Sequence, residues 1–152
     1  MNYELSEMRT ITLIVIHCSA VRPYQTSSAA EIDLWHKARK DRNGRPWKGI
    51  GYHYVVRRDG TVETGRPIEE QGSHCYPHNR HSIGICYEGG LNELGKEVDT
   101  RTPEQKRVLR ELIEKLHRQF PKALIVGHRD LSPGRGCPCF DVVSEYRDLQ
   151  PK

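Results

Sequence analysis

The sequence lacks an apolar run of the roughly 20 residues that a bilayer-spanning helix requires. Its longest apolar run, from Ile11 to Ile16, has the length of a β-strand and carries no signal-peptide cleavage pattern. We therefore expect cytoplasmic synthesis without a signal peptide and no membrane association. No basic tract is dense enough to predict nucleic-acid binding, since the net charge is only +4.

Repeats, linkers and low-complexity segments are also missing, so the 152 residues indicate one domain over residues 1–152. There is no C-x-x-C pair, which excludes a thioredoxin-like redox motif. The five cysteines are odd in number and no export signal accompanies them, which favours reduced thiols over a disulfide framework. What the chain does have is histidine, with eight residues. Histidine together with reduced cysteine makes a metal site worth seeking.

Strand-like and helix-like patterns alternate along the chain. The clearest helix runs from Pro103 to Phe120, where Thr102 is the cap and Gln105 completes a capping box. Strands are predicted at 10–16, 52–57, 62–64, 82–87 and 123–126, and further helices at 31–40 and 141–149. We therefore predict an α/β fold with a central mixed β-sheet flanked by helices.

Two of the predicted strands lead directly to a histidine, His17 after the first and His128 after the last. Cys137 follows His128 across a loop rich in glycine and proline. Two neutral imidazoles and a thiolate form a good zinc triad, and three protein ligands leave a fourth position for water. A single histidine is more often a surface or hydrogen-bonded residue than a ligand, and we keep that interpretation for His36, His78, His81 and His117.

The remaining cysteines and the tryptophans allow simpler interpretations. Neighbouring residues on a strand point to opposite faces, so Cys18 should face the core if His17 faces a site. Cys86 lies in an apolar strand and is read as a small buried hydrophobe, whereas Cys75 stays undecided. Trp35 and Trp47 are candidates for lining a sugar-binding cleft, although Trp35 fits the core face of a helix equally well.

Seven short strings in a fixed order resemble one enzyme family, the zinc-dependent N-acetylmuramoyl-L-alanine amidases of type 2. This family includes small phage lysozymes with amidase activity and the peptidoglycan recognition proteins. The resemblance covers about residues 11–148 and lies nearest to single-domain phage and prophage endolysins. The strings are Ile16-His17-Cys18-Ser19-Ala20, Gly51-Tyr52-His53-Tyr54, Arg58-Asp59-Gly60-Thr61-Val62, Gly72-Ser73-His74, His81-Ser82-Ile83-Gly84-Ile85, Gly127-His128-Arg129-Asp130 and Cys137-Pro138-Cys139-Phe140-Asp141.

The resemblance implies that Zn²⁺ is bound by His17, His128 and Cys137. Cys139 competes with Cys137 for the thiolate role, and we favour Cys137 because similar sequences use the cysteine that precedes proline. The expected activity is hydrolysis of the amide bond between N-acetylmuramic acid and L-alanine in peptidoglycan, as a phage or prophage endolysin. The enzyme would reach the cell wall only after release or export from the cytoplasm.

The resemblance also assigns three residues around the metal. Tyr52 matches the family's catalytic tyrosine, and His74 falls where the family lines its substrate groove. Arg135 occupies the position of a lysine that assists catalysis in the phage enzymes. An arginine is permanently charged, so it can stabilise an oxyanion but is a poor proton donor and acceptor.

Two further possibilities remain open at this point. The chain would be a non-catalytic peptidoglycan-binding module if it had lost a zinc ligand, as some family members have, but all three ligand positions are filled. A regulatory protein partner gains no support from the sequence. Peptidoglycan is therefore the expected partner, with no nucleic acid, and we expect a monomer.

Overall fold

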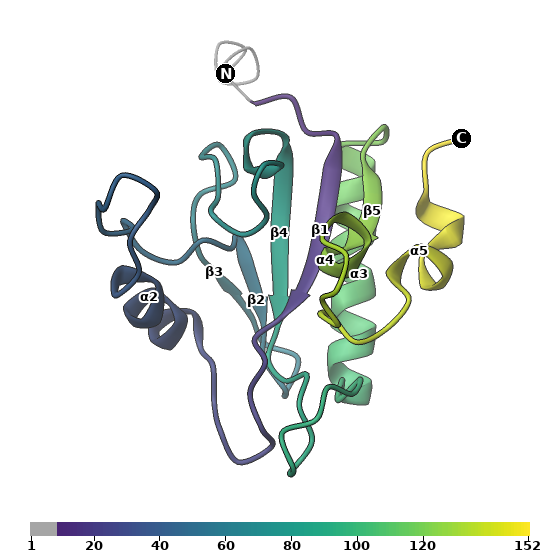
Figure 1. Cartoon of the computed structure of the whole chain (residues 1–152). Helices are drawn as coiled ribbons and strands as arrows, with labels where there is room; N and C mark the ends of the chain where they lie inside the picture. The colour runs from purple at the N-terminus through teal and green to yellow at the C-terminus, as the bar shows by residue number, and fades with distance from the viewer. Residues whose placement is uncertain (1–8) are drawn as a thin grey trace.

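A five-stranded sheet forms the centre of the computed structural model, which describes residues 9–152 (Figure 1). Its strands lie in the order β3-β2-β4-β1-β5 and are β1 Leu13–Cys18, β2 Tyr54–Val56, β3 Val62–Thr64, β4 Ser82–Tyr87 and β5 Leu124–Gly127. Four of them run parallel, while β3 pairs antiparallel with β2 through the predicted hairpin. The predicted mixed sheet is confirmed, and the bounds 1–152 for the domain stay a prediction.

The long helix α3, Pro103–Gln119, covers one face of this sheet (Figure 1). The Thr102 side chain accepts a hydrogen bond from the Gln105 backbone N–H, and the Gln105 side chain accepts one from the Thr102 backbone N–H. The predicted capping box is therefore present. The apolar stripe of α3 is buried against the side chains of β1 and β4 that point to this face, and the cluster includes Leu109, Leu112, Ile113, Leu116, Ile14, Ile16, Ile83 and Ile85. Among residues 9–152, no helix combines the length and apolar character that crossing a membrane requires.

The opposite face carries two shorter helices, α2 Ala29–Lys37 and α4 His128–Leu131. Ile32 of α2 packs on Val55 and Cys86, and Leu131 of α4 packs on a second small cluster. The prediction for α2, residues 31–40, was displaced towards the C-terminus. The helix begins at Ala29 because Ser28 and Glu31 form a capping box, and it ends at Lys37 because residues 39–47 turn into a hairpin.

The C-terminal segment does not form the single helix predicted for residues 141–149. It divides into α5 Val142–Glu145 and a 3₁₀ turn, η2 Arg147–Leu149, because Tyr146 leaves helical backbone angles. The Tyr146 ring is fully buried in the main core, so packing overrides helical continuity there. A second 3₁₀ turn, η1 Asn79–His81, precedes β4.

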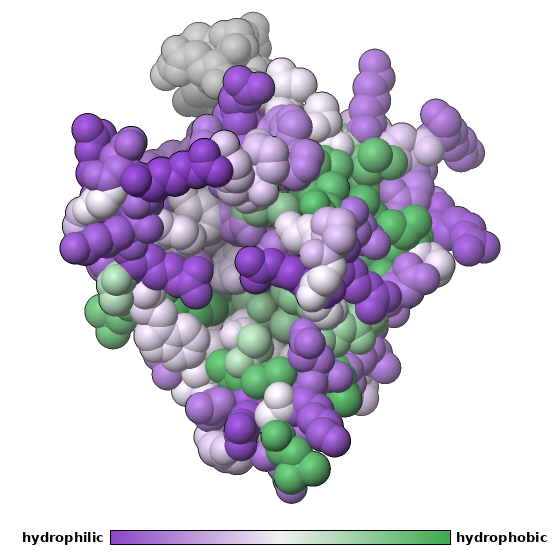
Figure 2. Space-filling view, viewed as in Figure 1, coloured by the Kyte–Doolittle hydropathy of each residue, from purple (hydrophilic) through white to green (hydrophobic). Residues whose placement is uncertain are grey.

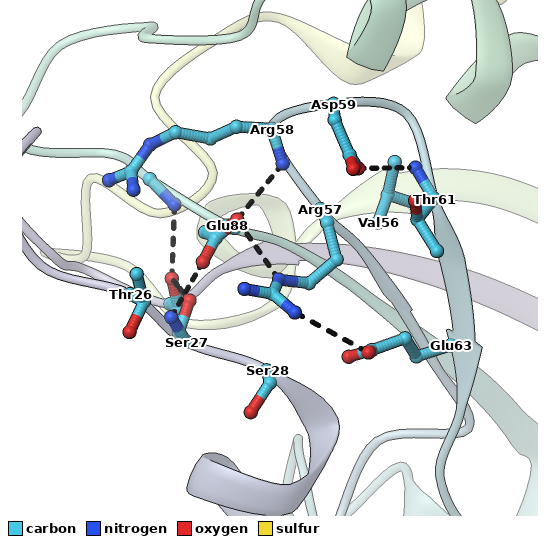
Figure 3. A network of polar contacts seen from close by, with 12 residues as sticks. Thr26, Ser27, Ser28, Val56, Arg57, Arg58, Asp59, Thr61, Glu63 and Glu88 are labelled. Carbon is cyan, nitrogen blue, oxygen red and sulfur yellow. Dashed lines mark hydrogen bonds and ion pairs between the residues drawn. The ribbon is translucent and has the colours of Figure 1, made fainter.

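A buried carboxylate, Glu88, ties the start of α2 to the hairpin after β2 (Figure 3). Its two oxygens accept hydrogen bonds from the Ser27 backbone N–H at 2.7 Å, the Arg58 backbone N–H at 2.9 Å and the Arg57 guanidinium at 3.1 Å. Burial by itself would raise the pKa of Glu88, but these donors hold it below its ordinary value. Glu88 is therefore ionised at neutral pH and joins segments that are distant in the sequence.

We expect Glu88→Gln to lower the free energy of unfolding by about 2 kcal/mol at neutral pH, since the buried side chain loses the charge that its three donors stabilise and Arg57 keeps only Glu63 as a charged partner. A depressed carboxyl pKa stabilises the fold above the unfolded value and loses this contribution as pH falls. The difference from wild type should therefore shrink below about pH 4, which urea unfolding at several pH values measures. Glu93→Gln on an exposed turn is the matched control. A pH-independent difference, or one below about 0.5 kcal/mol, would contradict the assignment.

Candidate metal centre and active site

The parallel register of β1 and β5 brings the two predicted histidine ligands together. Ile16 pairs with Gly127, so the residues that follow them, His17 and His128, emerge side by side at one sheet edge. Their ring centroids lie 4.6 Å apart. Cys137 completes a group in which the potential ligand atoms of all three residues lie within 4.8 Å of one another.

The structure distinguishes the two cysteines of the Cys-Pro-Cys string. The Sγ of Cys137 accepts a hydrogen bond from the backbone N–H of Cys18 at 3.1 Å. Cys139 instead points its thiol at the carbonyl of Gly90, 3.5 Å away. A hydrogen bond with Cys18 and burial raise the pKa of Cys139, so it stays a thiol. Cys137, and not Cys139, therefore lies with the two histidines.

The other two cysteines that the sequence placed in the core lie there. Cys18 packs in the main core while His17 faces the site, as strand alternation predicted. Cys86 is fully buried in the small cluster beneath α2. Cys75, undecided from the sequence, is buried and lines the groove beside the triad.

A second layer of side chains holds His17 in place. Its Nε2 lies 2.8 Å from Nδ1 of His74, and Nε2 of His74 lies 3.0 Å from Oγ of Ser82. This contact engages Nε2 of His17, so Nδ1 is the nitrogen that would bind a metal ion. The His74 ring lies directly over Gly84, where a Cβ would come within 2.7 Å of it, so glycine is needed there for space.

The electrostatic surroundings suit neutral imidazoles. Burial, followed by the proximity of His74, lowers the pKa of His17 well below its ordinary value. Burial likewise lowers the pKa of His74 to about 3. A neutral imidazole is the form that binds a metal, and two imidazoles with a thiolate match the preferences of zinc with one position left open. The donor set therefore fits a Zn²⁺ ion of the catalytic type.

A groove of about 760 Å³ opens beside the triad. The Tyr52 ring lines it, with its centroid 5.0 Å from that of His17. Burial raises the pKa of Tyr52 well above its ordinary value, so its phenol keeps its proton and can donate a hydrogen bond. Arg135 lines the same groove with an exposed side chain. The structure thus gathers all six predicted site residues around one opening.

The tryptophan prediction is half right. Trp47 lines the groove and meets His36 edge to face at 5.0 Å. Trp35 lies neither in the groove nor in the core, since it is 45% exposed on the outer side of α2. The buried face of α2 is formed by Ile32 and His36 instead.

Three of the four histidines read as hydrogen-bonded or surface residues, His36, His78 and His81, keep that role. Nδ1 of His36 accepts the Gly51 backbone N–H at 2.8 Å, and burial lowers the pKa of His36 to about 4. His78, which precedes η1, stacks on His81 at its end, with 3.2 Å between Nδ1 of His78 and Nε2 of His81. His117 on α3 differs, since it is half-buried and its Nδ1 has no hydrogen-bond partner among the described residues.

Two features of the site were not predicted from the sequence. Oδ1 of Asn79 accepts the backbone N–H groups of His74 and Cys75, both at 2.8 Å, and so fixes the loop that carries His74. The basic side chains of residues 39–42 line the groove, although their segment was read only as the end of a helix and a loop. An asparagine side chain in a loop has no spacing that would have identified it, whereas the cluster of basic residues at 39–42 was a visible signal that was not used.

The sequence pattern of the N-acetylmuramoyl-L-alanine amidase family matches residues 7–140. The chain belongs to this family. It is 38% identical over 133 residues to an endolysin of Enterobacteria phage T3, covering 88% of this chain and 83% of the relative. An endolysin of Escherichia phage T7 is 36% identical over 139 residues, with 91% and 87% covered.

Solved structures of amidases share the fold. The N-acetylmuramoyl-L-alanine amidase LysC from Clostridium intestinale superposes with a TM-score of 0.73 at 30% identity, covering 96% of this chain and 89% of its own. The wild-type PGRP-LB of Drosophila, at 22% identity and a TM-score of 0.69, shows the same fold over 91% of this chain and 80% of its own. The family predicted from the seven strings is confirmed, and with it the amidase activity on peptidoglycan expected of an endolysin.

Proposed function

We propose that this site hydrolyses the amide bond between N-acetylmuramic acid and L-alanine with a Zn²⁺ ion held by His17, His128 and Cys137. The observation that carries the proposal is the convergence of these three donors, from segments more than 100 residues apart in sequence, at one end of the groove. When bound there, Zn²⁺ supplies a Lewis acid that activates water for attack on the amide carbonyl.

The chain's own residues then stabilise the reaction. The Tyr52 phenol, protonated at neutral pH, donates a hydrogen bond to the carbonyl oxygen as negative charge develops on it. Arg135 adds a permanent positive charge on the same groove and acts electrostatically, without gaining or losing a proton. His36 and Trp47 line the same groove and offer the substrate an aromatic surface.

His74 acts in this proposal as a positioning residue as well as part of the groove. Because it holds Nε2 of His17, we expect His74→Ala to weaken zinc affinity by about 10–100-fold while the fold is retained. Competition with a chelator at graded concentrations measures this affinity, and circular dichroism reports the fold. His117→Ala on α3 is the matched control. Unchanged zinc affinity in His74→Ala would leave His74 with a groove role alone.

Digestion of purified peptidoglycan by the zinc-loaded protein tests the proposal directly. Mass spectrometry should show free stem peptides with a new L-alanine N-terminus and glycan strands without peptides. Binding to peptidoglycan with no release of stem peptide would establish the alternative, a non-catalytic binding module. We further propose that the protein acts as a monomer on the cell wall after release or export. The molecular mass from sedimentation tests the oligomeric state, and the location of wall-bound protein tests the site of action.

A further inference from the structure

The segment after α2 forms a defined hairpin at the rim of the groove. Lys40 pairs with Pro46 in an antiparallel bridge, and the Trp47 backbone N–H donates to the Arg39 carbonyl at 2.9 Å. The Asp41 carboxylate accepts two backbone N–H groups of the turn, at 2.9 and 3.0 Å. We call residues 39–47 the rim hairpin. Its hydrogen bonds give it a fixed shape.

The rim hairpin presents an excess of positive charge to the groove. Arg39, Lys40 and Arg42 are exposed and line it, and none of them forms an ion pair within the described part of the chain. Asp41 is the one acidic residue among the described groove-lining residues, and its carboxylate is engaged by the turn. In Figure 2, long hydrophilic side chains project over this region, at the upper left of the view. The groove therefore carries cations without local counter-charges.

Aromatic rings orient two of these cations. The Arg39 guanidinium lies over the Trp47 ring at 5.5 Å from its centroid. The Arg42 guanidinium lies over Tyr76 at 4.0 Å, and Tyr76 belongs to the loop that also carries His74. Arg42 thus spans from the rim hairpin to the other wall of the groove. Cation–π contacts of this kind restrict the side chains and keep their N–H groups directed at whatever occupies the groove.

We propose that the rim hairpin is a specificity element that binds the free carboxylates of the stem peptide, so that the enzyme discriminates against stem peptides whose carboxylates are amidated. This inference rests on the proposed function: when the scissile amide lies beside the triad, the stem peptide attached to it lies in the groove. The stem peptide continues beyond L-alanine with free carboxylates, and guanidinium and ammonium groups recognise carboxylates directly. Each exposed ion pair between one of these cations and a carboxylate changes the affinity by a small factor. Together, the three cations are expected to give a preference of about tenfold for the carboxylate form over the amidated form.

The test compares two synthetic muramoyl peptides that differ only in carrying carboxylates or carboxamides beyond L-alanine. For wild-type protein loaded with zinc, we expect kcat/KM to be about tenfold higher for the carboxylate form at low salt, and the ratio to shrink as salt rises. The triple variant Arg39→Gln, Lys40→Gln, Arg42→Gln should bring the ratio close to one, because kcat/KM falls more for the carboxylate form than for the carboxamide form. The matched control Lys106→Gln, Lys115→Gln, Arg118→Gln removes the same charge from exposed positions of α3, on the other face of the sheet.

Each outcome decides one of the two proposals. Equal cleavage of both peptides by wild type, or an unchanged ratio in the triple variant, overturns the specificity role and leaves the amidase intact. Loss of the ratio in the α3 control as well would assign the effect to net charge and also overturn it. If neither peptide is cleaved, the proposed function fails; calorimetric binding of the same two peptides then gives the ratio directly, and equal affinities overturn the inference.

Discussion

Replacing Cys137 by serine is expected to remove bound zinc and to reduce amidase activity by at least about 1,000-fold. The thiolate is the only anionic donor in the triad, and a serine hydroxyl is a far weaker zinc ligand at neutral pH. The backbone N–H of Cys18, which donates to the Cys137 sulfur, would have only a neutral oxygen to face. Metal analysis of the purified protein and the release of stem peptides measure the two losses together.

Cys139→Ser is the control that the chain itself offers, since it lies two residues away and carries the same change. Its side chain donates to the Gly90 carbonyl, which a serine hydroxyl can also do. We therefore expect zinc content and activity to stay near wild type and stability to fall by no more than about 1 kcal/mol. The reverse pattern, with Cys139→Ser losing zinc and Cys137→Ser keeping it, would exchange the roles of the two cysteines.

Tyr52→Phe is expected to leave zinc bound but to lower kcat by about 100-fold, with KM little changed. The ring at 5.0 Å from His17 is retained, and only the phenol donor that serves the developing oxyanion is removed. Steady-state kinetics on a soluble muramoyl peptide, together with metal analysis, measures both quantities. Tyr24→Phe, at an exposed tyrosine outside the groove, should behave as wild type. A kcat within about threefold of wild type in Tyr52→Phe would remove the phenol from the mechanism.

Local sequence signals predicted those elements whose causes are local. The capping box at Thr102 and Gln105, with Pro103 in the first position, determines where α3 begins, and its apolar stripe determines which side is buried. The same kind of signal at Ser28 and Glu31 was available for α2 and would have corrected its boundary. The division of the last helix at Tyr146 depends instead on packing against residues distant in the sequence, because the Tyr146 ring is buried in the main core. No local pattern encodes it.

The sequence by itself determined the chemistry of this protein: the family strings, the candidate ligands His17 and His128, and a thiolate from the Cys-Pro-Cys string. The tertiary structure decided which atoms meet. The register of β1 against β5 places the two histidines together, and the contacts of the two sulfurs put Cys137, not Cys139, beside them. The contact of His74 with His17 and the cationic rim hairpin likewise exist only in the folded chain. Residue types determine which chemistry is possible. The distances and orientations between those residues depend on the pairing of strands that are far apart in the sequence, and this pairing cannot be read from the order of residues.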